Sequence, residues 1–298
     1  MSRLVKKYIT YLEKEKKLSK NTVESYIRDI RQLDEFAKNS GIKDLCDVTK
    51  PMLTSYIVHM QRMKKAPSSI ARSTASLRSF YNFALISGYV EQDPTENLKI
   101  PKAEESNTPA VLELDEIKRL LDIPRTVDFK GYRDKAILEL MYATGMKVSE
   151  LISLRADEID LDKQFIICGK GSHRRAVPIG EMAVYALTRY VENARNRQVV
   201  SEQAPELFLN LNGQALTRQG LWKILKDYKK RANITSEITP DTIRHTFAVH
   251  MLDNGVDMGS VQNMLGNVSN STSALYKKMM EGNLSEVYKK AHPRAGRK

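Results

Sequence analysis

Residues 239–250 read TPDTIRHTFAVH, a stretch that predicts an amphipathic helix. Thr239 supplies a capping hydroxyl, and Pro240 suits the first helical turn. Apolar side chains then recur at helical spacing, at Ile243, Phe247, Met251 and Leu252. This pattern places Arg244 beside the apolar stripe, where its guanidinium can face a pocket instead of bulk water.

Two short stretches follow this helix. Gly255 is expected to end it, LGN at 265–267 to close a second short helix, and ALY at 274–276 to lie on a third element. Three side chains of different chemistry can therefore converge on one phosphate from separate elements: Arg244, Asn267 and Tyr276.

The segment DTIRHTFA at 241–248, with MLGN at 264–267 and LY at 275–276, resembles the signature of the tyrosine recombinases, the phage integrase family. A second match is ATGMKVSEL at 143–151, where the family usually shows ATG-x-R-x-SEL. Within the family, the sequence is most similar to the bacterial recombinases that resolve chromosome dimers. The resemblance covers nearly the whole chain, and it implies DNA binding and recombination in chromosome partition at cell division.

Three positions depart from the family pattern. Asp241 stands where the family usually has His, Asn267 where it has His or Trp, and Lys147 where it has Arg. The resemblance makes all three positions catalytic. Lysine keeps the positive charge but cannot form the arginine fork. An ionised carboxylate at position 241, about 5 Å from a phosphate, would repel it by roughly 3 kcal/mol at an effective dielectric constant of about 20.

The resemblance implies strand cleavage through a 3′-phosphotyrosyl intermediate, with no metal and no cofactor. Tyr276 would be the nucleophile, and Arg244 would clamp the phosphate. Lys170, in the GKG turn of a β-hairpin at 164–179, would protonate the leaving 5′ oxygen. Taken without the family, a packing tyrosine, a buried ion-pair arginine and a surface turn lysine are the alternatives. Two residues are expected to support the site, Glu150 and His245.

The length of 298 residues predicts about two domains on a prior of ~150 residues each. Residues 1–100 are expected to form four helices and resemble the core-binding domain that clamps DNA in the family. The segment Asp93–Pro109 carries three prolines and no helical period, so it is expected to connect the domains, with 101–109 as the linker. Residues 110–298 would form the catalytic domain and end in a docking helix. The predicted fold class is therefore mainly α, with a small antiparallel sheet in the second domain.

Basic side chains follow both predicted domains. The formal net charge is +12, which favours an anionic partner such as duplex DNA. The segment 216–220 begins a helix and can place Arg218 on a DNA backbone, whereas Trp222 on the same helix is expected to anchor the core. In the first domain, a phosphate-contacting face is expected at Lys64, Lys65, Arg72 and Arg78.

Composition narrows the cellular setting. Cys46 and Cys168 are the two cysteines, far apart in the sequence, so neither a disulfide framework nor a zinc site is expected. Residues 1–20 contain no signal-peptide core, and no run approaches the ~20 apolar residues of a membrane span. We expect a cytoplasmic protein without membrane contact.

Two further functions stay open beside site-specific recombination. A catalytically weak homologue can bind its DNA site as an architectural or regulatory protein. A nicking-and-closing enzyme of the type IB topoisomerase kind shares the chemistry but acts as a monomer. Recombination would need four protomers on two duplexes, as a homo-tetramer or a hetero-tetramer with a related recombinase, and the resemblance adds a DNA translocase as a partner.

Overall fold

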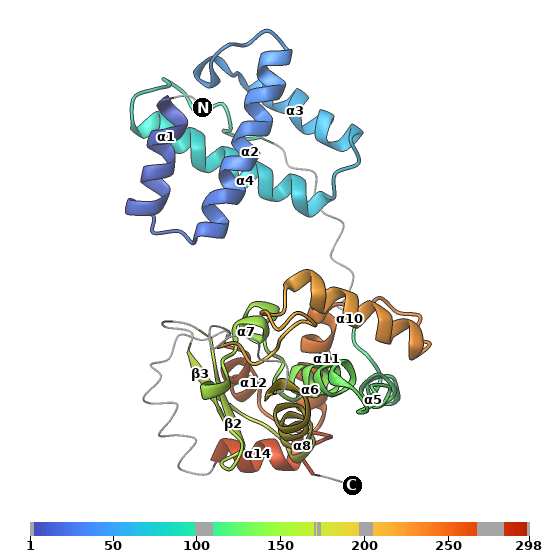
Figure 1. Cartoon of the computed structure of the whole chain (residues 1–298). Helices are drawn as coiled ribbons and strands as arrows, with labels where there is room; N and C mark the ends of the chain where they lie inside the picture. The colour runs from blue at the N-terminus through green and yellow to red at the C-terminus, as the bar shows by residue number, and fades with distance from the viewer. Residues whose placement is uncertain are drawn as a thin grey trace. The chain divides into compact units, whose positions relative to one another are not determined.

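The computed structural model describes residues 3–98, 110–169, 171, 174–196, 205–266 and 283–296 (Figure 1). By its internal contacts the chain divides into two compact units, Met1–Ser106 and Asn107–Lys298. Helices make up most of both units, and a small antiparallel sheet lies in the second. The predicted fold class is confirmed. Within the described residues, none of the helices is both long and apolar enough to cross a membrane.

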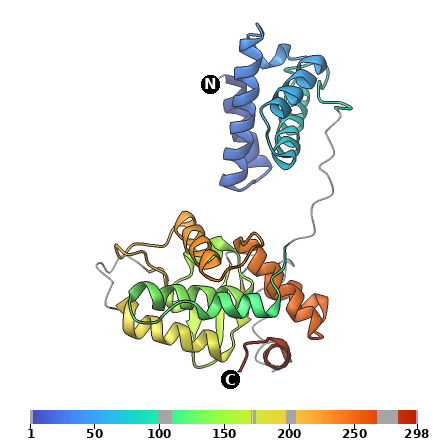
Figure 2. The same cartoon turned by 90° about the vertical axis from the view of Figure 1, so that its right-hand side faces the viewer.

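The first unit is helical throughout. Its elements are α1 (Arg3–Thr10), a π-helical turn (Tyr11–Glu15), α2 (Lys20–Asn39), a 3-10 turn (Leu45–Asp47), α3 (Lys50–Arg62) and α4 (Pro67–Ile86). Ser19 caps α2, because its Oγ accepts the amide of Thr22 at 3.3 Å. Helix α4 packs against α2 (Figure 2). Tyr8 and Phe80, both fully buried, meet edge to face at 5.2 Å in the core of this unit.

The segment that follows α4 packs on the first unit as far as Leu98, although its sequence predicts a connecting segment from Asp93 onward. Leu98 is buried and packs into the helical core, and the Asp93 carboxylate accepts two hydrogen bonds from Thr95. Arg78 Nη2 donates to the Leu98 carbonyl at 3.1 Å. Buried Leu98 and its bond to Arg78 hold this segment on the first unit, which therefore extends at least to Leu98. The linker at 101–109 stays a prediction.

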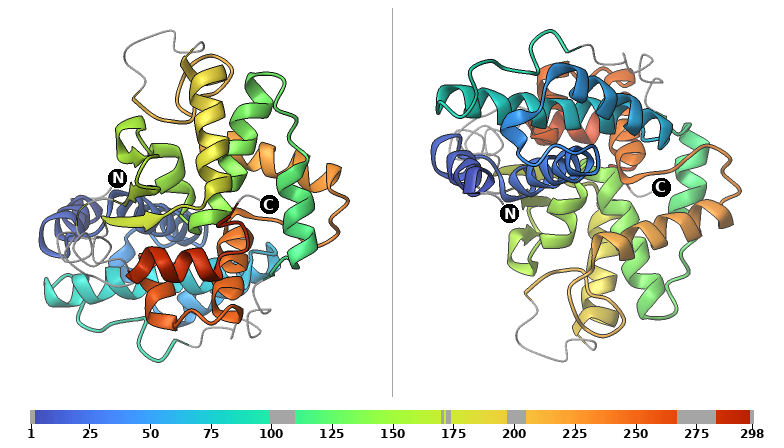
Figure 3. Two further views of the ribbon diagram at one scale, coloured as in Figure 1. Left: turned by 90° about the horizontal axis from the view of Figure 1, so that it is seen from below. Right: turned by 90° about the horizontal axis from the view of Figure 1, so that it is seen from above.

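The second unit is built around α6 (Phe129–Thr144), which is buried along most of its length. Helices α8 (Glu181–Tyr190) and α11 (Pro240–Asp253) pack against it (Figure 3). The remaining helical elements lie around these three: α5 (Leu114–Asp122), α7 (Val148–Ser153), a 3-10 turn (Ala156–Glu158), a π-helical turn (Val191–Arg195), α10 (Arg218–Arg231), α12 (Met258–Leu265) and α14 (Asn283–Ala291).

The sheet consists of β1 (Ile159–Asp160), β2 (Phe165–Cys168) and β3 (Arg175–Pro178), antiparallel in that order. The predicted hairpin is the β2–β3 pair, whereas the two-residue β1 is too short to give a sequence pattern. The register of the β2–β3 hairpin pairs Cys168 with Arg175. Strand β3 contacts α12 and α14, so the sheet lies beside both helices (Figure 1).

The C-terminal segment is seated on the second unit itself. The Tyr288 hydroxyl accepts the Gly180 amide at 3.2 Å, and the Ala295 carbonyl accepts the Glu181 amide at 2.8 Å. His292 is buried, with Nε2 at 3.2 Å from the Tyr142 carbonyl oxygen. These bonds fix α14 and the residues that follow it. Docking of this helix into a neighbouring subunit stays a prediction.

Candidate functional site

Arg244 ties three segments that lie far apart in the sequence. It stands one turn into α11, where Thr239 caps the helix by accepting the Thr242 amide at 3.0 Å. Its Nη1 donates to the Gly145 carbonyl at 2.7 Å, and its Nη2 donates to the Leu265 carbonyl at 2.9 Å. The end of α6 and the end of α12 therefore meet at one guanidinium. These two bonds use two of the five N–H donors that an arginine carries.

Two glycines make this approach possible. Gly145 (φ +57°) follows α6 and Gly266 (φ +72°) follows α12, both in the left-handed conformation that closes a helix. A β-carbon on Gly145 would lie 2.6 Å from Cδ1 of Phe247 and 2.7 Å from Cδ2 of Leu265. The turn after α6 can thus lie directly against α11 because its first residue has no side chain.

The nonapeptide at 143–151 forms this turn and the start of α7. Lys147 is the N-cap residue and is exposed, and its amide donates to Glu150 Oε2 at 2.8 Å. Glu150 in turn forms a two-bond ion pair with Arg175, from Nη1 to Oε1 at 2.7 Å and from Nη2 to Oε2 at 3.0 Å. Burial alone would raise the pKa of Glu150, but the bonds and charge of Arg175 outweigh it and hold this pKa below its ordinary value.

Arg175 is the residue that sequence reasoning missed. The sequence shows it only as the first residue of the return strand, yet its side chain is buried and its Nε donates to the Met264 carbonyl. The available signal was a charged residue at the head of the apolar run AVPI, which predicts a buried partner of opposite charge. We call Lys147, Glu150, Arg175, Asp241 and Arg244 the Arg244 cluster.

Charged neighbours act on the pKa of Arg244. Burial lowers the pKa of Arg244, the charges of Glu150 and Asp241 oppose this shift, and the charge of Arg175 adds to it. Asp241 is exposed in the first turn of α11, where a carboxylate also favours the positive end of the helix dipole. The charges of Glu150 and Asp241 thus act on Arg244, and Glu150 is bonded to the Lys147 amide. A shared phosphate site at these residues stays a prediction.

The histidines of α11 differ in their surroundings. His245, an expected supporting residue, is partly exposed next to Arg244 in the helix. His250 Nδ1 lies 2.8 Å from the Tyr142 hydroxyl, which links α11 to α6. His250 thus has a structural hydrogen bond. The predicted positions of Tyr276, Lys170 and Asn267 lie outside the described residues, so their assignments stay predictions.

The basic residues of the first unit fall into two groups. Lys64 and Lys65 are exposed in the connection between α3 and α4. Arg72 Nη1 donates to Ser25 Oγ at 2.8 Å and also bonds Asp29, which is 1% exposed. Arg78 donates to the Leu98 carbonyl, as described above. Arg72 and Arg78 are six residues apart, about 120° around a helix, so these two do not share one face. Both have structural bonds in addition to any contact with DNA.

Helix α10 carries several exposed basic residues. Arg218 is exposed at its first position, after Thr217 Oγ1 accepts the Gly220 amide at 3.0 Å. Trp222 is 43% exposed, one turn after Arg218 and one turn before Lys226. The expectation that Trp222 anchors the core is wrong, because Leu221, Ile224 and Leu225 occupy the buried face.

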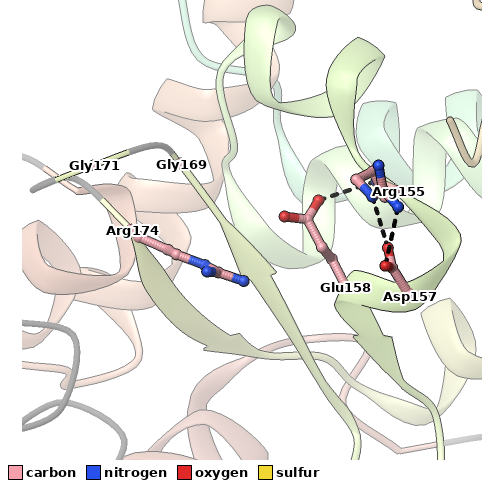
Figure 4. A pocket seen from close by; sticks show the side chains of 6 residues that line it. All are labelled: Arg155, Asp157, Glu158, Gly169, Gly171 and Arg174. Carbon is pink, nitrogen blue, oxygen red and sulfur yellow. Dashed lines mark hydrogen bonds and ion pairs between the residues drawn. The ribbon is translucent and has the colours of Figure 1, made fainter. Parts of the chain in front are cut away.

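A polar pocket lies at the base of the β2–β3 turn (Figure 4). Its volume is about 410 Å³, and it is lined by Arg155, Asp157, Glu158, Gly169, Gly171 and Arg174. Arg155 donates two bonds to Asp157, at 2.9 and 3.2 Å, and its amide donates to Glu158 at 3.0 Å. Among these described lining residues, the formal charges of the two arginines and the two carboxylates balance.

Comparison with family models divides the chain in two. Residues 110–282 match the Phage integrase family, and residues 5–88 match the phage integrase N-terminal SAM-like domain. All five residues of the Arg244 cluster fall within the first match. Lys64, Lys65, Arg72 and Arg78 fall within the second.

Known proteins extend these matches to the full length. The chain is 38% identical to tyrosine recombinase XerD of Staphylococcus epidermidis over 99% of this chain and 100% of that protein. It is also 38% identical to XerD of Halalkalibacterium halodurans, over 98% of each. Among solved structures, the Tn1549 transposon integrase in complex with a circular intermediate DNA aligns with a TM-score of 0.73 at 19% identity, covering 93% of this chain and 98% of that one.

A lambda integrase tetramer bound to a Holliday junction aligns with a TM-score of 0.66 at 15% identity, over 90% of this chain and 77% of that one. At such identities these structures show the fold alone. The two family models and the full-length relatives show more, and they agree with the motifs at 143–151 and 241–248. The chain belongs to the tyrosine recombinases of the phage integrase family, and it is similar to XerD along its whole length.

Proposed function

We propose that the protein is a site-specific DNA recombinase that cleaves and exchanges strands through a 3′-phosphotyrosyl intermediate. The observation that carries this proposal is the placement of Arg244. Its guanidinium is held by two main-chain carbonyls from separate segments, so its orientation is set before DNA binds. A preorganised cation of this kind stabilises the charge that develops on a phosphate during strand cleavage.

The chemistry divides among five further positions. The Tyr276 oxygen forms a bond to phosphorus, the bond from phosphorus to O5′ breaks, and O5′ takes a proton from Lys170. The phenolic proton leaves to a neighbouring base or to water. Arg244 and Lys147 hold the non-bridging oxygens, Asn267 donates a neutral hydrogen bond, and Asp241 stands where the family usually has a histidine. Glu150 and His245 support this arrangement from α7 and α11.

Duplex DNA is the substrate, and four protomers act on two duplexes. The protomers are copies of this chain or pairs with a related recombinase, and a DNA translocase acts with them. The exposed basic residues of both units suit contacts to the phosphate backbone. These residues include Lys64, Lys65 and Arg218, with Arg72 and Arg78 contributing charge from positions that are already bonded within the protein.

The test is capture of the covalent intermediate. The binding site is first selected from random duplexes, and a nicked version that traps the cleaved strand is then offered to the protein. We expect a covalent protein–DNA adduct that persists in chelator and disappears in Tyr276→Phe, with DNA affinity nearly unchanged. Tyr185→Phe, which alters an exposed tyrosine of α8, is the matched control and should form the adduct normally. An adduct formed by Tyr276→Phe would refute the assignment of the nucleophile.

A second function is favoured by one observation. Asp241 is exposed in the first turn of the helix that carries Arg244, and its charge acts on that arginine, so it would repel a phosphate bound there. A protein with this arrangement can bind its DNA site as an architectural or regulatory factor without cleaving it. Salt-sensitive binding to a defined site, combined with no adduct under the conditions above, would establish this function instead.

A further inference from the structure

Arg175 holds three elements together from a buried position. It begins β3, it bonds Glu150 of α7 through both terminal nitrogens, and its Nε bonds the Met264 carbonyl of α12. Its side chain is 3% exposed, and that of Glu150 is 10% exposed. A buried fork of this kind has a fixed geometry, because each of its bonds restricts the plane of the guanidinium.

The same guanidinium supports the turn that follows α12. A β-carbon on Gly266 would lie 2.7 Å from Nη1 and 2.9 Å from Cζ of Arg175. The Gly266 main chain therefore packs closely against the Arg175 guanidinium. Two arginines therefore bond adjacent carbonyls at the end of α12. Arg175 bonds that of Met264, and Arg244 bonds that of Leu265.

We infer that Arg175, paired with Glu150, is a positioning residue for Arg244. By fixing the last turn of α12, it sets the place of the Leu265 oxygen, and that oxygen sets the orientation of the Arg244 guanidinium. This inference rests on the proposed function only in its consequence for strand cleavage. The positioning itself is a property of the protein without DNA.

Arg175 does not act on the phosphate directly. Its three bonds point into the protein, toward Glu150 and Met264, and its side chain is buried. It therefore cannot replace the guanidinium that the family usually has at position 147. Glu150 adds a second effect, because its negative charge compensates Arg175 and limits repulsion between the two arginines. The pair is expected to fail as a unit when either member is changed.

The protein contains a matched control pair. Arg133 bonds Asp134 through Nε and Nη2 and bonds the Leu209 carbonyl through Nη1, and both side chains are buried. This is the same set of acceptors, one carboxylate and one main-chain carbonyl, at a site outside the Arg244 cluster. Arg175→Lys and Arg133→Lys thus each remove a buried fork while keeping the charge. Glu150→Gln is a milder change that keeps the shape of the partner.

Two measurements test the inference on full-length protein. The first is hydrogen exchange of the main-chain amides of residues 261–266 without DNA. We expect exchange there to accelerate at least about tenfold in Arg175→Lys and Glu150→Gln, and to stay within about twofold of wild type in Arg133→Lys. The second is the single-turnover rate of adduct formation at saturating suicide DNA. We expect Arg175→Lys to lower it about 10- to 100-fold, the loss from one misplaced charge-assisted bond, with DNA affinity changed less than about threefold.

The outcomes separate this inference from the proposed function. If wild type forms no adduct, the proposed catalytic function fails, and the exchange measurement alone decides the positioning role. Unchanged exchange at 261–266 in both Arg175→Lys and Glu150→Gln would overturn the inference. So would normal cleavage by Arg175→Lys, or an equal loss of cleavage in Arg133→Lys, which would indicate general destabilisation.

Discussion

Gly145 lies so close to Phe247 that a β-carbon would come within 2.6 Å of ring atom Cδ1. The contact joins the turn after α6 to the helix that carries Arg244. It brings the Gly145 carbonyl to Nη1 of that arginine, at 2.7 Å. Packing and the geometry of the candidate site are thus set at the same place.

Gly145→Ala should reduce stability by about 3 kcal/mol, because it adds an overpacked methyl group to an unfavourable left-handed conformation. Gly255→Ala separates the two causes. Gly255 (φ +85°) also has a left-handed conformation, but no neighbouring atom lies within 4 Å of the added carbon. We expect this control to lose only about 1 kcal/mol. Urea unfolding measures both, and equal losses would exclude the clash with Phe247 and Leu265.

Restoring the usual family residues should raise the rate of adduct formation in a definite order. Asp241→His should help most, because it removes a negative charge beside the phosphate and supplies a donor. Lys147→Arg should come next through the recovered fork, and Asn267→His least, because asparagine already donates. The gains should not add, since the three side chains would share one phosphate. The rate on suicide DNA is measured for each single variant and for the triple variant.

Two results would contradict this account of the three positions. Slower cleavage by Asp241→His in a cleavage-competent protein would show that Asp241 works as a base. A triple variant that never forms an adduct on its identified site would favour the DNA-binding function without cleavage.

Lys65 and Arg72 should respond differently to truncation. Lys65→Ala removes an exposed charge, so the slope of log affinity against log salt should fall by about 1 while stability stays the same. Arg72→Ala should also lower stability, by about 2 kcal/mol, because it leaves buried Asp29 without its arginine. Salt titrations of DNA binding and urea unfolding measure the two effects. Lys38→Ala, on the exposed pair with Asp34, is the control for a lysine with no assigned DNA contact.

His292 should make stability depend on pH. Burial lowers its pKa from 6.5 to about 4, so the unfolded chain binds this proton before the folded protein does. Stability is therefore complete above about pH 6.5 and falls as the pH drops toward 4, by about 3 kcal/mol from this group. His292→Phe keeps a ring beside Tyr288 and should remove this part of the loss. Urea unfolding at about pH 7 and about pH 4.5 tests it, and an unchanged loss in the variant would exclude His292 as the cause.

The sequence predicts the helices, the hairpin and the family because these depend on local signals. Ser19, Thr239 and the glycines at helix ends each act within a few residues, and the family motifs are contiguous. The fold class follows from such signals alone. The resemblance to the family, and no local signal, implies that Lys147, Glu150 and Arg244 share one site.

The rest depends on contacts between distant segments. The pairing of Glu150 with Arg175 joins a helix to a strand 25 residues later, and no periodicity connects them. Trp222 is exposed because other apolar residues of α10 fill the buried face. The composition of this helix does not show which of its apolar residues are buried. Arg78 and Arg72 look like simple surface cations in the sequence, but they bond Leu98 and Asp29 through tertiary packing.

Arg244 is held by main-chain oxygens, and this has a consequence for how the site can change in evolution. Every residue type supplies a carbonyl, so substitutions around Arg244 do not remove its acceptors as long as the two turns keep their glycines and Arg175 keeps its pair with Glu150. Side chains at 147, 241 and 267 can therefore drift without releasing the arginine. A lineage that loses cleavage and later regains it would still inherit a correctly oriented Arg244 guanidinium, because the fold itself keeps that orientation.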